Sequence, residues 1–220
     1  MLVVNQILNN GTHILRYPTD TKEKTIIVSG IGRCGTTAVI KSLQLCGVQL
    51  KNEQVAKRTL DDWGIGTFLD DKDSRSLRKE IVRRNLDYDV WGFKWHMIPQ
   101  WDNYLSMFRN PLLIVLTRDH TAVACRASTD LDGLDNYGQW LKNISIWQLQ
   151  LNYCLINDIK IPTILVSYEK LLLNPKSVLS TICSFCGISC TDDAVNSIVA
   201  NDKNYTSSNA VRQAWLNDSN

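Results

Sequence analysis

The chain has 220 residues, and 44% of them are hydrophobic, which is enough to build one sizeable core in a single compact domain spanning residues 1–220. Its 24 basic and 22 acidic residues give a formal net charge of +2, so the composition argues against nucleic acid as the main partner. The sequence has no run of about 18 apolar residues that could span a membrane, and its N-terminus lacks the features of a signal peptide. We therefore expect a cytoplasmic protein.

Short β-branched, apolar segments alternate with helical patterns along the chain. The expected strands cover residues 25–29, 90–94, 112–117 and 163–167. The expected helices between them include residues 36–46, which end at Gly47, and residues 135–158, where apolar side chains recur at helical spacing. Such alternation is typical of a parallel α/β sheet, and these sheets bind ligands beyond the carboxyl ends of their strands.

Residues 51–89 depart from this alternation. They are charged and irregular in pattern, with DDWGIGTFLDDKDSR at the centre. We predict a surface insertion, which acts as a lid or as part of the substrate-binding surface. Elsewhere the sequence contains no repeat and no linker that would divide the chain.

The segment GIGRCGTT, residues 30–37, lies between the first expected strand and the helix that follows it. Glycines allow backbone N–H groups to converge, and a helix N-terminus presents partial positive charge, so this segment predicts an anion site. Its spacing is that of a G-x-x-x-x-G-K-[ST] loop with Thr36 in place of the lysine. A nucleotide kinase uses that lysine, whereas here Arg33 supplies the positive charge.

The same segment resembles the 5′-phosphosulfate loop of sulfotransferases, which use 3′-phosphoadenosine 5′-phosphosulfate (PAPS) as donor and release adenosine 3′,5′-bisphosphate (PAP). Gly32 and Cys34 stand where that family usually has Pro and Ser. The resemblance implies a P-loop NTPase-like sulfotransferase fold, a three-layer α/β/α arrangement with a central parallel sheet. The loop residues that it assigns to PAPS binding are Gly30, Gly32, Arg33, Cys34, Gly35, Thr36 and Thr37.

Lys94 and His96 follow the second expected strand and resemble the Lys-x-His of cytosolic sulfotransferases, in which the histidine is the catalytic base. A neutral imidazole can accept a proton from a hydroxyl group near neutral pH. The resemblance therefore implies that His96 is the base and that Lys94 and Arg33 stabilise charge on the transferring group. His120 is the second candidate for the base, and a purely structural role for His96 is the alternative.

Arg118 follows the third expected strand and matches the family's arginine for the 3′-phosphate of PAPS. The family has a serine eight residues later, but this chain has Arg126 there and Ser128 two positions further. Residues two apart on a helix do not share a face, so we expect one of the two to contact the phosphate and favour Arg126, which can bind it bidentately. Tyr168 opens a segment that resembles the family's Tyr-Glu-Asp-Leu, which places it near the adenine unless it is a core residue.

These features predict an enzyme that transfers a sulfuryl group from PAPS to a hydroxyl group of a small molecule, a carbohydrate or another acceptor, with no bound metal. Trp63, Trp95, Trp101 and Tyr104 line an acceptor pocket or belong to the core. A small-molecule kinase is one alternative. A non-catalytic sulfotransferase-like binding protein is another, because the C-terminal tail offers only Arg212 where cytosolic sulfotransferases have Arg-Lys-Gly.

Seven cysteines occur in the chain, and Cys183, Cys186 and Cys190 cluster at the end of an expected amphipathic helix. A Cys-x-x-Cys pair can bind zinc or act in redox chemistry. No second Cys/His pair with zinc spacing accompanies it, so we predict buried structural thiols rather than a metal or redox site.

Overall fold

The computed structural model describes residues 10–50, 60–96, 102–128 and 136–203. Within these residues one five-stranded sheet forms, with strand order β1-β5-β4-β2-β3. Its strands are β1 (Thr12–Arg16), β2 (Lys24–Gly30), β3 (Val90–Lys94), β4 (Pro111–Thr117) and β5 (Thr163–Ser167). The four strands β2 to β5 are parallel, which confirms the predicted sheet. The additional strand β1 pairs antiparallel with β5 at the edge, and the sequence pattern did not reveal it.

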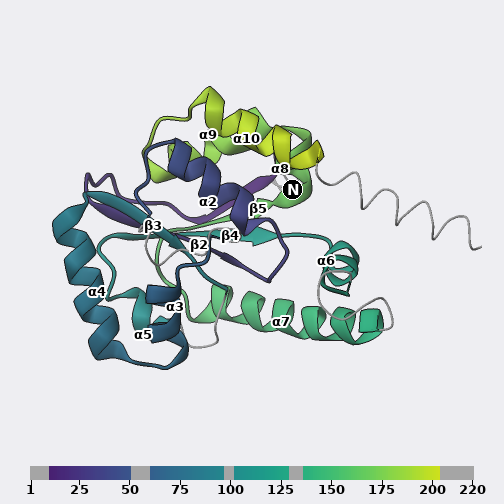
Figure 1. Cartoon of the computed structure of the whole chain (residues 1–220), viewed down its shortest axis with the longest axis horizontal. Coiled ribbons are helices and arrows are strands. Elements are labelled where there is room, and N and C mark those ends of the chain that lie inside the picture. Colours follow the sequence, from purple (N-terminus) through teal and green to yellow (C-terminus); the bar gives the residue numbers. More distant parts are fainter. Residues whose placement is uncertain (1–9, 51–59, 97–101, 129–135, 204–220) are drawn as a thin grey trace, which may run out of the picture.

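Helices cover both faces of the sheet (Figure 1). One layer consists of α2 (Thr36–Leu45), α8 (Tyr168–Leu173), α9 (Pro175–Cys186) and α10 (Asp192–Lys203). The other contains α3 (Trp63–Asp70), α4 (Ser74–Asp87), α5 (Asp102–Leu105), α6 (His120–Ala127) and α7 (Tyr137–Asn157). The predicted three-layer α/β/α fold is therefore confirmed. No helix among the described residues combines the length and apolarity needed to cross a membrane.

Each face of the sheet has its own buried core. Along β4, Leu112 and Ile114 pack with α2, α9 and α10, whereas Leu113 and Val115 pack with the helices of the opposite layer. Side chains of a strand alternate between its two faces. A strand covered on both sides must therefore be apolar at nearly every position, which explains the continuous apolar run in β4.

The segment predicted to be irregular contains two helices. Asp62 caps α3 and Asp73 caps α4, each by accepting a hydrogen bond from a backbone N–H three residues later, at 3.0 Å. Ile65 of α3 and Ile81 of α4 are buried against the sheet. The many charged residues of α4 hid its narrow apolar face, so the sequence pattern was misleading about secondary structure here.

The four parallel strands end at one edge of the sheet. The next strand along the chain, β3, pairs with one side of β2, and the strand after it, β4, pairs with the opposite side of β2. The strand order therefore reverses beside β2. In open α/β sheets, ligands bind at such a reversal, outside the carboxyl ends of the strands.

Candidate active site

A pocket of about 600 Å³ lies beyond the carboxyl ends of β2, β3 and β5. Its volume is in the range of small-molecule sites. The structure brings most of the predicted site residues together there, and the predicted residues that line it are Gly30, Gly32, Arg33, Gly35, Thr36, Thr37, Lys94, His96, Arg126 and Tyr168. Cys34, Arg118 and Ser128 are not among its lining residues.

The loop between β2 and α2 has the backbone of an anion site. Arg33 and Gly35 have φ angles of 69° and 98°, in the left-handed region. Alternating left- and right-handed residues direct successive N–H groups into one concavity. Gly35 is also required by close packing, because a Cβ atom there would lie 2.1 Å from the ring of Tyr168. The loop thus turns α2's N-terminus and the Thr36 and Thr37 side chains toward the pocket.

Cys34 faces away from the pocket. Its side chain is buried in the core beneath the loop, and its backbone N–H donates to the carbonyl oxygen of Ile31 at 3.2 Å. Burial raises the pKa of the Cys34 thiol to about 12. The thiol therefore remains neutral near physiological pH, and it supports the loop from below.

Arg118 and Tyr168 brace the loop from the neighbouring strands. The Arg118 guanidinium lies 5.2 Å from the centre of the Tyr168 ring and donates to the carbonyl oxygen of Arg33 at 3.0 Å. Arg126, on α6, lines the pocket. The hydroxyl of Ser128 is buried and donates to the Ala124 carbonyl oxygen at 2.6 Å. Of the two alternatives, the structure therefore places Arg126 at the pocket.

Lys94 carries a buried positive charge into the pocket from the end of β3. Its ammonium group pairs with the Asp61 carboxylate, and the Asp62 N–H donates to the Lys94 carbonyl oxygen at 3.1 Å. Arg84 in turn pairs with Asp62, with both side chains 1% exposed. This chain of contacts fixes the start of α3 beside the end of β3.

His96 lies at the pocket's exposed side. Its side chain is 56% exposed, and its Nε2 atom lies 3.8 Å from Oδ1 of Asp70. The Trp95 indole donates to the same Asp70 oxygen at 3.2 Å and meets Trp63 edge to face, with ring centres 5.2 Å apart. His96 is thus outside the hydrophobic core, as the catalytic interpretation requires. His120, the second candidate, begins α6 and does not line the pocket.

Two pocket residues, Asp61 and Asp70, were not identified from the sequence. Both flank α3, within the segment that had been predicted to be irregular. The available signal was Asp62 as an N-cap before WGIGTFLD, which would have identified α3 and placed an aspartate at each of its ends. Trp63 and Trp95 do line the pocket, Tyr104 packs instead with the core, and Trp101 is outside the described residues.

Comparison with protein families identifies the chain. The model of the sulfotransferase domain matches residues 23–219, which is most of the sequence. The chain belongs to the sulfotransferase family. This assignment confirms the resemblance seen in residues 30–37.

Solved structures agree with this sulfotransferase fold. The sulfotransferase domain from the curacin biosynthetic pathway superimposes with a TM-score of 0.50 at 16% identity, over 81% of this chain and 77% of that one. A mouse sulfotransferase complexed with PAP gives a TM-score of 0.46 at 14% identity, over 83% of this chain and 64% of that one. A comparison with curated proteins finds no match. At 16% identity, the similarity to the curacin-pathway domain supports the fold and not the substrate.

Proposed function

We propose that this sulfotransferase transfers a sulfuryl group from PAPS to a hydroxyl group of an acceptor and releases PAP. The observation that carries the proposal is the single pocket in which the glycine-rich loop, Lys94 and His96 meet. Thr36 stands where an NTP-binding loop has lysine, which favours a sulfuryl donor over a nucleoside triphosphate. No corresponding observation favours the kinase alternative.

The described residues suit a nucleotide carrying two separated anionic groups. The loop N–H groups, together with Thr36 and Thr37, are placed to bind the 5′-phosphate. Arg126 can bind the 3′-phosphate with its forked donors. Tyr168 lines the pocket, but its side chain is only 2% exposed and packs against Gly35, so it supports the loop rather than stacking on the adenine. When bound, this co-substrate supplies the activated sulfuryl group.

Side chains of the protein then accept the proton of the acceptor hydroxyl and stabilise the charge on the transferring group. His96 accepts the proton of the acceptor hydroxyl, and Asp70, 3.8 Å from Nε2, stabilises the imidazolium that results. Lys94 and Arg33 stabilise negative charge on the transferring sulfonate and on the oxygen that it leaves. The ion pair with Asp61 holds the Lys94 ammonium group in place at the pocket.

The acceptor side of the pocket combines carboxylates with indoles. Asp70 provides negative charge, whereas the charge of Asp61 is offset by its ion pair with Lys94; Trp63 and Trp95 provide apolar surface. Such a wall repels carboxylate-bearing acceptors and suits neutral or cationic alcohols, including sugars that stack on an indole face. We therefore propose that the predicted insertion, residues 51–89, contributes the acceptor surface through α3, within one sulfotransferase domain.

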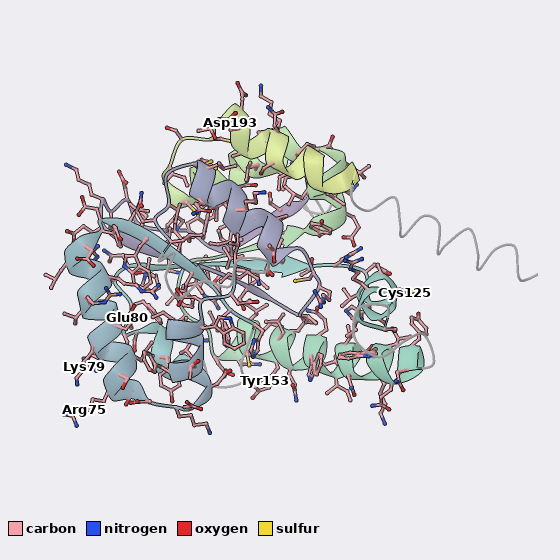
Figure 2. All side chains as sticks on the ribbon, in the orientation of Figure 1. Arg75, Lys79, Glu80, Cys125, Tyr153 and Asp193 are labelled. Atoms are coloured by element: carbon pink, nitrogen blue, oxygen red, sulfur yellow. The ribbon has the colours of Figure 1, made fainter. Side chains whose placement is uncertain are left out.

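An Arg33→Ala variant tests the proposal. Loss of a charged hydrogen bond costs about 1.5–3 kcal/mol, so PAP should bind roughly 10- to 150-fold more weakly in calorimetry. Transfer from PAPS to a panel of neutral, cationic and carboxylate-bearing alcohols should fall in parallel. Arg75→Ala, which removes an exposed cation near the start of α4, is the control (Figure 2).

Three outcomes would contradict the proposal. One is wild-type PAP affinity and transfer in Arg33→Ala. The second is stabilisation of the wild type by ATP with Mg²⁺ but not by PAP, which would support a kinase. The third is tight PAP binding without transfer to any acceptor class, which would support a non-catalytic binding protein.

A further inference from the structure

Three cysteines from distant parts of the sequence meet on the sheet face opposite α3 and α7. Cys46 follows α2, Cys183 lies on α9, and Cys190 precedes α10. Their three sulfur atoms lie within 4.8 Å of one another, although Cys46 and Cys183 are 137 positions apart. Cys183 is buried, whereas Cys46 and Cys190 are half-buried. The cluster therefore combines closely spaced sulfurs with access for a small ion.

The sulfur spacing matches that of ligands around one metal ion. Two sulfurs bound to tetrahedral zinc at about 2.3 Å lie about 3.8 Å apart. The Sγ atoms of Cys46 and Cys183 are 3.7 Å apart, far beyond the roughly 2.05 Å of a disulfide bond. Thiolates favour soft ions such as Zn²⁺ and Cu(I) over Mg²⁺ or Ca²⁺. Among the described residues, no imidazole or carboxylate joins the three sulfurs, so water is left as the fourth ligand.

The start of α10 supplies charge compensation. Thr191 caps this helix by accepting from the Ala194 N–H at 3.2 Å, and its hydroxyl lies 3.9 Å from the Cys46 sulfur. A helix N-terminus carries partial positive charge. It offsets part of the net negative charge that three thiolates and one divalent ion would create, although Asp192 and Asp193 in the same turn oppose it.

Without a metal ion, the buried Cys183 thiol keeps its proton. Burial, followed by the adjacent thiols of Cys46 and Cys190, raises the pKa of Cys183 well above its usual range. A metal ion must therefore displace the thiol protons in order to bind, as at other thiolate sites.

We propose that Cys46, Cys183 and Cys190 together bind one zinc ion, which links α2, α9 and α10. Binding breaks three S–H bonds, forms three Zn–S bonds and releases three protons to solvent. Zinc affinity therefore falls as the pH is lowered. None of the three cysteines lines the pocket proposed for sulfuryl transfer, so the site stabilises the fold and takes no part in that reaction.

The test measures zinc in the full chain, purified under reducing conditions without chelator. Elemental analysis should find one zinc per wild-type chain. In competition with a chromophoric chelator, Cys190→Ser should weaken zinc binding roughly 100-fold or more, since even indirect supporting contacts are worth 10–100-fold. Cys125→Ser and Cys154→Ser are matched controls that should retain zinc. Figure 2 shows Cys125 on α6, well away from Asp193 at the start of α10.

A second measurement uses the wild-type protein, so that the proposal can be tested even if a cysteine variant folds poorly. Cd²⁺ titrated into metal-free wild type should produce thiolate-to-metal charge-transfer absorption, and chelation of zinc should lower the wild-type melting temperature but not that of Cys190→Ser. Absence of both zinc and the cadmium absorption would overturn the proposal. So would equal zinc loss in Cys125→Ser, or a Cys46–Cys183 disulfide found by peptide mapping of the purified protein.

Discussion

The proposed chemistry depends on His96. Because this side chain is exposed, its replacement can test catalysis without a large change in stability. More than half of its side chain is exposed, and its neighbours at the pocket are the Trp95 ring and the Asp70 carboxylate. Replacing an exposed side chain of this kind usually changes stability very little. A loss of activity in a His96 variant can therefore be attributed to the lost imidazole rather than to unfolding.

We predict that His96→Ala and His96→Asn lower kcat by about 10²–10⁴-fold while PAP affinity stays near the wild-type value, because a general base acts mainly in the transition state. Single-turnover rates and melting temperatures measured on the same preparations check this. A variant that melts early yet transfers at the wild-type rate would remove His96 from the mechanism.

Gly35 shows how one backbone position shapes the loop. Its φ of 98° is unfavourable for any residue with a side chain, and an added Cβ would meet the Tyr168 ring. We predict that Gly35→Ala lowers the free energy of unfolding by more than about 1 kcal/mol and weakens PAP binding. Gly32→Ala is the stability control, because a Cβ there would have nothing within 4 Å. Equal unfolding curves for the two variants would contradict this account.

At the scale of elements, α3 carries the proposed acceptor wall, and a buried ion pair fixes the position of this helix. Asp62 caps α3, and its carboxylate also accepts a hydrogen bond from the Arg84 guanidinium. The Nε atom of Arg84 pairs in addition with Oε1 of Glu80, at 2.8 Å. Removing one member of such a pair leaves an uncompensated buried charge. The position of Asp61 and Asp70 at the pocket thus depends on contacts between α3 and α4.

We predict that Asp62→Ala lowers the free energy of unfolding by about 3–5 kcal/mol. Asp73→Ala removes the same kind of cap from α4 at an exposed position and should cost far less. The double variant Asp62→Ala/Arg84→Met should recover part of the loss, because no buried charge then lacks a partner. Urea unfolding measures all three. Similar losses of unfolding free energy in Asp62→Ala and Asp73→Ala would mean that the helix cap, and not the ion pair, accounts for the contribution of Asp62 to stability.

At the scale of the whole molecule, the carboxyl ends of β2, β3 and β5 and residues of α3 and α6 converge on one pocket. A ligand that binds only the folded state stabilises the entire chain, by about 2.7 kcal/mol at a concentration of 100 times its Kd. We predict that PAP raises the melting temperature more than AMP at equal concentration, because AMP lacks the 3′-phosphate proposed to bind Arg126. Arg126→Ala should reduce the difference between the melting-temperature increases caused by PAP and AMP, and Arg75→Ala should leave this difference unchanged. Equal stabilisation of the wild type by the two nucleotides would refute the placement of the 3′-phosphate.

Much of the fold and of the nucleotide side of the site could be predicted from the sequence, because both depend on local patterns. The apolar runs of the parallel strands, the glycines of residues 30–37 and the positions of Lys94 and His96 after a strand are short-range features. Parallel strands end at a common edge, so the sequence alone predicts that these residues meet.

Only the tertiary structure decided the contacts between distant segments. Asp61 meets Lys94 across 33 positions, and Cys46 meets Cys183 across 137. The same packing buried Cys34 and Ser128 and left Arg126 at the pocket. Such contacts depend on how helices pack on the sheet, since packing brings together side chains whose spacing along the chain carries no periodic signal. The sequence by itself therefore determined the sheet and its glycine-rich loop, while packing decided which carboxylates and indoles line the pocket and brought the three thiols together.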